Sequence, residues 1–150
     1  MRYATALLAF ILTIGAAAVS AQETTQVTLH KDPLCGCCEG YANHLRANGF
    51  SVSTVHTSDV GRVQQEAGIP QPMQACHMMT VEGYTVAGHV PLATPRRLLA
   101  ERPRIKGISL PGMPTGTPGM PGPKTEPFVV YEIPADTSTP VDEYRVYDIE

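Results

Sequence analysis

The sequence lacks the short motifs that mark several large enzyme classes. It contains no glycine-rich phosphate loop, no G-x-S-x-G nucleophile turn and no H-E-x-x-H zinc motif. Its carboxylate pairs, such as Asp142-Glu143, fall in a segment expected to be a solvated loop. No motif in the sequence therefore indicates a substrate-binding site, and the indications of function come from other residues.

The sequence also lacks a block of charge of either sign. Without Arg2, ten Lys and Arg residues stand against 14 Asp and Glu residues, which gives a net charge near −4. A nucleic-acid-binding protein usually shows a basic stripe or patch. We therefore expect no nucleic-acid partner.

Only one long hydrophobic run is present, from about Ala6 to Val19, and it is shorter than the roughly 20 residues that a membrane-spanning helix needs. Arg2 precedes the run and the small residues of "VSA" follow it, which is typical of a secretory signal peptide. We predict a signal peptide over residues 1–21, cleavage after Ala21, and a periplasmic mature chain with no membrane span. An uncleaved membrane anchor is the alternative.

Periodicity and turn signals divide the next part of the chain into strands and helices. The glycine and proline positions and the turn at Glu82-Gly83 set the boundaries. The predicted elements are a strand at 26–31, a helix from about 37 to 48, a strand at 50–56, a helix at about 60–67, two strands within 77–90, and a helix from 94 to 101 with Pro95 at its first position. This order predicts an α/β fold, a thioredoxin-like open mixed sheet with flanking helices.

Residues 107–127 contain five Gly and six Pro, so we expect no regular element in this segment. The segment repeats "PGMP" and carries Met113 and Met120. Two further strands are predicted within 128–134 and 143–150, forming a hairpin that either extends the sheet or closes over it. We assign residues 22–106 to a thioredoxin-like core and residues 107–150 to the same domain.

Three cysteines fall within four positions of the segment "DPLCGCCEGY", residues 32–41. Cys35 and Cys38 form a C-x-x-C pair at a predicted helix N-terminus, which favours thiolates and predicts thiol–disulfide exchange. Cys37 lies between them and would offer competing, strained disulfides. We therefore interpret the three thiolates as ligands for a soft metal.

Cu(I) fits these ligands best, because it is soft and because bridging sulfurs let a few cysteines hold several ions. Cys76 lies in the loop before the next predicted strand. In a thioredoxin-like fold this loop faces the N-terminus of the first helix. We predict that Cys76 completes a cluster that holds several Cu(I) ions.

Histidine and methionine side chains near these cysteines offer further donors. His89 follows a strand that returns toward the same edge, and Met113 lies in a segment where an exposed methionine has little use as a core residue. We predict both as copper ligands. The sequence leaves open whether three others are ligands: His77, Met78 and Met120.

Four motifs in order, "CGCC", "ACH", "EGYTVAGHVP" and "GISLPGMPTGTPGM", resemble the exported copper-resistance CopG family over roughly residues 26–131. The resemblance implies a thioredoxin-like periplasmic protein with a role in copper tolerance. It also implies that several copper ions are bound by Cys35, Cys37, Cys38 and Cys76, and it matches His89 and Met113 to a recurrent His and Met of the family. Other periplasmic copper-handling proteins are the implied partners. In "CHMM" the sequence departs from the family, where a small or hydroxyl residue often follows "CH".

The sequence is also compatible with two other functions. One is a thiol–disulfide oxidoreductase that uses Cys35 and Cys38, and the other is a protein with a structural zinc site. The sequence does not determine whether copper is stored, transferred or changed in oxidation state. It therefore leaves open whether the protein is an enzyme, with a copper-dependent oxidoreductase as the class to consider. The oligomeric state is equally undetermined.

Overall fold

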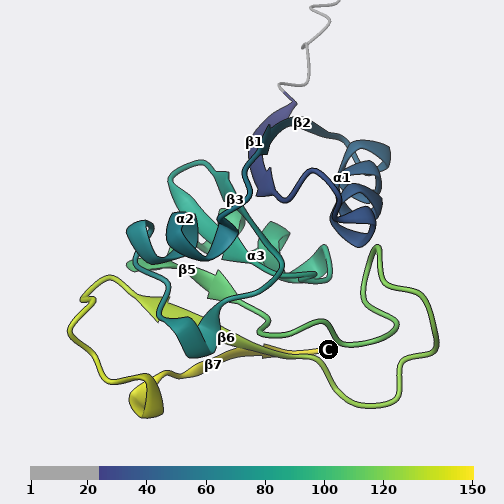
Figure 1. The fold of residues 1–150 in the computed structure, drawn as a ribbon. Helices are drawn as coiled ribbons and strands as arrows, with labels where there is room; N and C mark the ends of the chain where they lie inside the picture. Colours follow the sequence, from purple (N-terminus) through teal and green to yellow (C-terminus); the bar gives the residue numbers. More distant parts are fainter. Residues whose placement is uncertain (1–23) are drawn as a thin grey trace, which may run out of the picture.

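The structure, a computed structural model, describes residues 24–150. These residues form a mixed sheet of seven strands with helices packed on it (Figure 1). The strand order across the sheet is β2-β1-β3-β4-β5-β6-β7. The predicted signal peptide, residues 1–21, lies outside the described residues. Within the described residues, no helix has the length and apolar character needed to cross a membrane.

The strands are β1 (Thr25–Lys31), β2 (Phe50–His56), β3 (His77–Val81), β4 (Tyr84–Ala87), β5 (Ile105–Ser109), β6 (Val129–Pro134) and β7 (Val146–Ile149). The helices are α1 (Gly36–Ala47), α2 (Val60–Glu66) and α3 (Ala93–Glu101), with short 3-10 turns η1 (Gln71–Met73) and η2 (Val141–Glu143). β1 pairs in parallel with β2, β4 pairs in parallel with β5, and the other neighbours are antiparallel.

Helices cover both faces of the sheet, because alternate strand residues point to opposite sides and the strands β3 and β6 carry apolar residues on both. On one face, Leu29 and Met79 pack in a core that includes Tyr41 of α1 and Leu98 of α3. On the other face, a smaller cluster beside α2 includes Met78. This arrangement confirms the predicted α/β class with an open mixed sheet and is consistent with a thioredoxin-like fold.

Local signals account for most of the element boundaries. Asp59 caps α2 by accepting a hydrogen bond from the backbone N–H of Arg62 at 2.9 Å. The β3–β4 hairpin turns at Glu82 and Gly83, whose φ angles of 46° and 88° suit a tight two-residue turn. One start is misplaced in the prediction: α3 begins at Ala93, so Pro95 is its third residue instead of its first.

The prediction that residues 107–127 contain no regular element is wrong at its start. β5 runs through Ser109 and lies parallel to β4, with Gly107 opposite Thr85. A Cβ atom on Gly107 would overlap the carbonyl oxygen of Thr85. The glycine therefore allows the close approach of two strands, which is a tertiary use that composition does not reveal.

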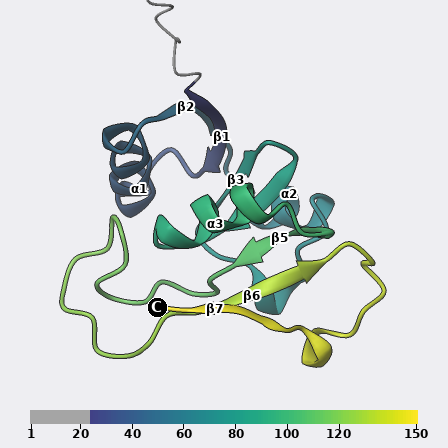
Figure 2. The ribbon, with the colours of Figure 1, turned by 180° about the vertical axis from the view of Figure 1, so that it is seen from behind.

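The two C-terminal strands form a hairpin that extends the sheet and does not close over it, which is one of the two predicted arrangements. β6 pairs antiparallel with β5, and β7 pairs antiparallel with β6. Beyond β5, residues 110–127 fold back toward α1, which both views of the ribbon show (Figures 1 and 2). The backbone of Gly119 packs against Gly40, since a Cβ atom on Gly40 would lie 3.2 Å from the Cα of Gly119.

The Gly107 contact yields a test of the β4–β5 pairing. Gly107→Ala should lower the free energy of unfolding by more than about 2 kcal/mol, because the added methyl group forces the two backbones apart. Urea denaturation measures this change. Gly36→Ala is the matched control: its Cβ atom would meet nothing within 4 Å, so a change below about 1 kcal/mol is expected. Equal midpoints for Gly107→Ala and the unmodified protein would contradict the pairing.

Candidate metal centre

Several chain segments meet at one edge of the sheet. β1 ends there at Lys31, and β3 begins there at His77, its antiparallel partner in register. The segment after β4 returns to the same place, where the Gly88 N–H donates to the His77 carbonyl at 3.0 Å. β1 leads through a short turn into α1, so the N-terminus of α1 faces the loop that carries Cys76.

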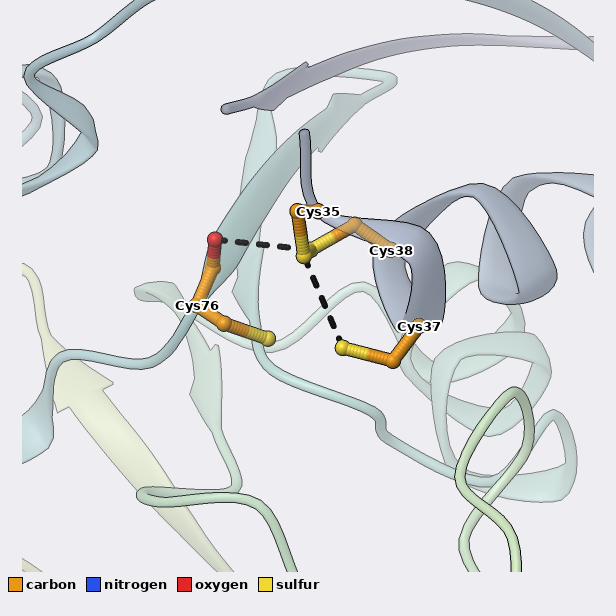
Figure 3. Close-up of side chains that lie close together, drawn as sticks. All are labelled: Cys35, Cys37, Cys38 and Cys76. Carbon is orange, nitrogen blue, oxygen red and sulfur yellow. Dashed lines mark hydrogen bonds between the residues drawn. A yellow bond between two sulfur atoms is a disulfide. The ribbon is translucent and has the colours of Figure 1, made fainter. Parts of the chain in front are cut away.

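Cys35, Cys37 and Cys38 lie at this helix N-terminus, with Cys35 in the N-cap position (Figure 3). Cys35 and Cys38 are joined by a disulfide across a Cα–Cα distance of 5.4 Å. Cys37 and Cys76 are free thiols, and the Sγ atom of Cys37 lies 3.5 Å from that of Cys35. The described residues thus contain one disulfide and two free thiols.

The loop that carries Cys76 is held by Gln64, a side chain of α2 that is 1% exposed. Its side-chain Oε1 accepts from the Ala75 N–H at 2.9 Å, and its Nε2 donates to the Ala75 carbonyl at 2.8 Å. These paired bonds fix the backbone one residue before Cys76. The Cys76 carbonyl oxygen then lies 3.6 Å from the Cys38 Sγ atom.

The four sulfur atoms of Cys35, Cys37, Cys38 and Cys76 all lie within 4.8 Å of one another. The structure thus brings together the four cysteines that the sequence singled out. Burial, and secondarily the neighbouring Cys37, raises the pKa of the Cys76 thiol to about 12. A metal ion that binds Cys76 therefore has to displace its proton, since the thiolate is the ligand.

His89 is fully buried and its ring is oriented by a backbone carbonyl. Nδ1 lies 2.7 Å from the Pro118 carbonyl oxygen, which only accepts, so Nδ1 carries the proton. Nε2 is then unprotonated, and it faces the Cys76 Sγ atom at 3.2 Å. Burial lowers the pKa of His89, which keeps the ring neutral and its Nε2 lone pair available to a metal.

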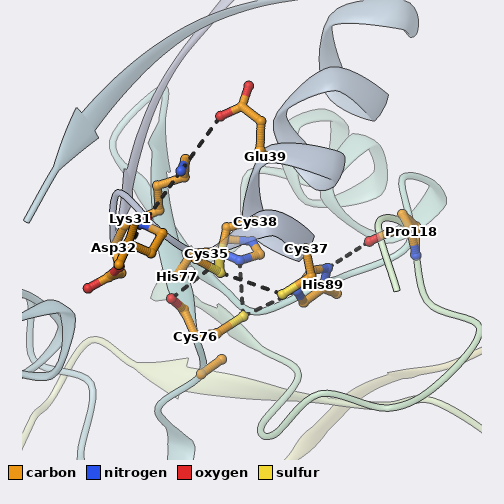
Figure 4. Close-up of a disulfide and its surroundings, with 12 residues drawn as sticks. Lys31, Asp32, Cys35, Cys37, Cys38, Glu39, Cys76, His77, His89 and Pro118 are labelled. Carbon is orange, nitrogen blue, oxygen red and sulfur yellow. Dashed lines mark hydrogen bonds and ion pairs between the residues drawn. A yellow bond between two sulfur atoms is a disulfide. The ribbon is translucent and has the colours of Figure 1, made fainter. Parts of the chain in front are cut away.

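His77, which the sequence left open, also contacts the Cys76 thiol, and its ring lies next to that of His89 (Figure 4). Its Nδ1 is 3.4 Å from the Cys76 Sγ atom, and its ring centroid is 4.7 Å from those of both Tyr41 and His89. Burial, with a smaller contribution from His89, lowers the pKa of His77 to about 3. Cys76, His77 and His89 form a second group whose donor atoms all lie within 4.8 Å.

The methionines are placed differently from one another. Met113 follows Gly112, which forms a parallel bridge with Ala75, so its backbone lies next to that of Cys76. Its side chain is 55% exposed, whereas Met120, in the same loop, is half-buried. Met78 packs in the core cluster beside α2, on the opposite sheet face from His77. The structure thus brings Met113 to the edge of the centre and places Met78 away from it.

Comparisons with known proteins show which family the chain belongs to. Two solved structures, both of a copper resistance protein CopG, match the chain: form 2 with a TM-score of 0.76 and 34% identity, and form 1 with a TM-score of 0.74 and 33% identity. Each match covers 85% of this chain, and the matches cover 99% and 98% of the two CopG chains, respectively. The chain belongs to the CopG family.

A family model described as a protein of unknown function, DUF411, matches residues 73–120 of this CopG-family protein. That stretch contains Cys76, His77, His89 and Met113, and it ends before the C-terminal hairpin. No curated protein matches the chain. The solved CopG structures therefore carry the assignment for the remaining segments, including the C-x-C-C motif.

Three residues around the candidate centre of this CopG-family protein were not identified from the sequence. Gln64 and Pro118 act through long-range contacts that no local pattern predicts. Lys31 is 2% exposed at the end of β1, where its Nζ donates to the Asp32 carbonyl at 3.1 Å and lies 3.6 Å from a Glu39 carboxylate oxygen. Lys31 continues the alternation of Val27 and Leu29, and this spacing is the one sequence feature that indicates its burial.

The buried neutral His77 makes stability depend on pH. The unfolded chain takes up a proton near pH 6.5, while the folded chain resists protonation of His77 down to about pH 3. Stability present above pH 6.5 is therefore lost as pH falls, by about 2 kcal/mol between pH 7 and pH 5. Urea denaturation at the two pH values measures the loss. His77→Phe keeps a ring against Tyr41 and should reduce the loss, and equal stability of the unmodified protein at both pH values would contradict the assignment.

Proposed function

We propose that this CopG-family protein is an exported copper-binding protein that holds several Cu(I) ions through Cys35, Cys37, Cys38 and Cys76 and serves copper resistance. The observation that carries the proposal is the approach of the four sulfur atoms to within 4.8 Å of one another. Three of these cysteines come from one helix N-terminus, where the backbone N–H groups and the helix dipole favour negative charge.

The charge and softness of the donors favour Cu(I) over zinc. Four thiolates carry four negative charges, which four Cu(I) ions would neutralise, whereas one Zn²⁺ would leave two negative charges in a pocket that is half-buried to buried. His89 and Met113 are the proposed additional ligands, through Nε2 and the thioether. The relatives named as copper resistance proteins support the choice of metal.

The disulfide sets a condition on this function. A sulfur atom in a disulfide has no thiolate to offer, so Cys35 and Cys38 join the cluster only after reduction. Cys37 and Cys76 are already free thiols. We infer that copper loading needs the reduced protein.

The remaining parts of the proposal concern location and organisation. We propose that residues 1–21 are a signal peptide, that the mature chain is periplasmic, and that other periplasmic copper-handling proteins exchange metal with it. Residues 22–106 would form the metal-binding core and residues 107–150 would complete the same domain. The packing of Gly119 against α1 supports the second assignment, because it joins the late loop to the cysteine-bearing helix.

Loss of Cys37 tests the cluster directly. Cys37→Ser should lower the copper retained by the reduced protein to roughly half or less, because one bridging sulfur is removed. The measurement is copper per chain after anaerobic Cu(I) loading and desalting. Leu34→Ser is the matched control, since Leu34 is 92% exposed and offers no donor. Unchanged loading of Cys37→Ser would contradict a cluster that uses this residue.

A second candidate function, thiol–disulfide exchange, is favoured by the disulfide at the N-terminus of α1. In this reaction the Cys35 thiolate would attack a substrate disulfide and release one substrate thiolate. Cys38 would then attack the mixed disulfide, releasing the second thiol and closing the Cys35–Cys38 bond. Two electrons pass from the protein dithiol to the substrate.

Turnover of a disulfide substrate separates this candidate from copper binding. If exchange is the function, the protein reduces insulin with dithiothreitol as the electron source, Cys35→Ser abolishes turnover, and Cys76→Ser keeps it. Copper binding as the sole function predicts no turnover by the unmodified protein. The insulin precipitation rate, compared with the uncatalysed rate, decides between them.

A further inference from the structure

Three donor atoms gather in the pocket without any contribution from the disulfide. The Cys76 Sγ atom lies 3.4 Å from Nδ1 of His77 and 3.2 Å from Nε2 of His89 (Figure 4). One donor atom from each residue lies within 4.8 Å of the others. None of these atoms is consumed when Cys35 and Cys38 are joined.

The His89 ring is held as metal-binding histidines usually are. Such a ring donates its second N–H to a carboxylate or a backbone carbonyl, which fixes the tautomer and directs the other nitrogen at the metal. Here Nδ1–H donates to the Pro118 carbonyl at 2.7 Å. The Nε2 lone pair is thereby aimed at the space beside the Cys76 thiol, and the loop backbone at Pro118 is part of the site.

The His77 ring is buried without a strong polar partner. The side chain is 0% exposed, and its Nε2 has no hydrogen-bond partner among the described residues. Its other nitrogen has only the long contact with the Cys76 thiol. Burying an imidazole with so little hydrogen bonding is costly, and a metal bond at Nδ1 would offset part of that cost, with the proton then on Nε2.

We propose that Cys76, His77 and His89 form a site for one divalent cation of borderline softness, such as Zn²⁺, in the protein whose Cys35–Cys38 disulfide is closed. One thiolate and two imidazoles are a donor set that such cations accept in tetrahedral geometry. Three protein ligands leave a fourth position, which water would fill.

This inference goes beyond the proposed function, because it concerns another metal class and another state of the protein. The Cu(I) cluster needs four thiolates and hence the reduced pair, whereas the divalent site needs one thiolate and both histidines. Cys76 belongs to both sets, as does His89, the proposed additional copper ligand, so the two modes exclude each other. The state of the Cys35–Cys38 pair would then select which class of metal the pocket holds.

The first experiment titrates Co²⁺, a coloured and redox-stable probe, into the disulfide form under anaerobic conditions. Thiol counting beforehand verifies two free thiols per chain, those of Cys37 and Cys76. The expected result is one Co²⁺ per chain with the visible bands of a four-coordinate ion, displaced by Zn²⁺. Absence of these bands, with no Co²⁺ retained on desalting, would overturn the proposal.

Thiol protection assigns the ligand without any substitution. Zn²⁺ bound to the disulfide form should slow alkylation of Cys76 by iodoacetamide at least about tenfold and leave the rate at Cys37 unchanged. Mass spectrometry of the peptides gives both rates. Protection of Cys37 instead, of both alike or of neither would overturn the assignment.

Variants then separate this site from the copper cluster. His77→Phe keeps a ring beside Tyr41 and should weaken Co²⁺ binding at least about tenfold, while circular dichroism verifies the fold. Cys37→Ser should retain the Co²⁺ site even though it reduces Cu(I) loading. Full Co²⁺ affinity in a folded His77→Phe protein would overturn the divalent site and leave the copper proposal standing. Poor Cu(I) loading of the unmodified reduced protein, with the Co²⁺ site present, would overturn the copper proposal and leave the divalent site standing.

Discussion

The antiparallel pairing of β1 with β3 is the contact on which the metal centre depends. It sets Lys31, the last residue of β1, opposite His77, the first residue of β3. The turn that follows β1 and the loop that precedes β3 must then meet at one sheet edge, which brings the C-x-C-C cysteines to Cys76. A slip of one residue would exchange the faces of His77 and Met78 and remove an imidazole from the pocket.

The elements around that pairing keep the pocket closed. Gln64 holds the Ala75 backbone from the α2 side, and the Tyr41 hydroxyl donates to the Val90 carbonyl at 2.9 Å from the α1 side. Pro118 and Gly119 bring the late loop against His89 and α1. The thiols and imidazoles are therefore largely shielded from water. In such a shielded site, interactions between charges and metal ions are stronger than in bulk solvent.

The fold could be predicted where the signals are local. Alternation marks β1 and β2, Asp59 marks the start of α2, and Glu82-Gly83 marks the hairpin. The strand β5 was missed because its glycine looks like a loop signal, and only contact with Thr85 reveals its purpose. Local composition carries no information about a partner strand some 20 residues away.

The cysteines of the centre could be predicted because their crowding is visible in the sequence, and so could the position of Cys76, given the fold. His77 was left open because its direction depends on the β1–β3 register, which alternation alone does not fix. Gln64 carries no signal, since a buried glutamine that holds a distant backbone looks like any other glutamine on a helix. The positions of Met113 and Met78 follow likewise from the bridge at Gly112 and from the sheet face.

The observed disulfide and the proposed thiolate cluster need the same sulfur atoms, so they exclude each other. The structure has the pair Cys35–Cys38 closed and the thiols Cys37 and Cys76 free. We propose that reduction turns this arrangement into a four-sulfur site for Cu(I). That claim concerns Cys35 and Cys38 above all, since only they change state.

Counting free thiols in the reduced, Cu(I)-loaded protein tests this claim most directly. Under anaerobic conditions, with excess copper removed, we expect all four thiols to resist a thiol reagent and to become reactive again once a Cu(I) chelator is added. Reaction of Cys35 and Cys38 at the rate of the copper-free reduced protein, with copper still bound, would contradict a centre built from all four sulfur atoms.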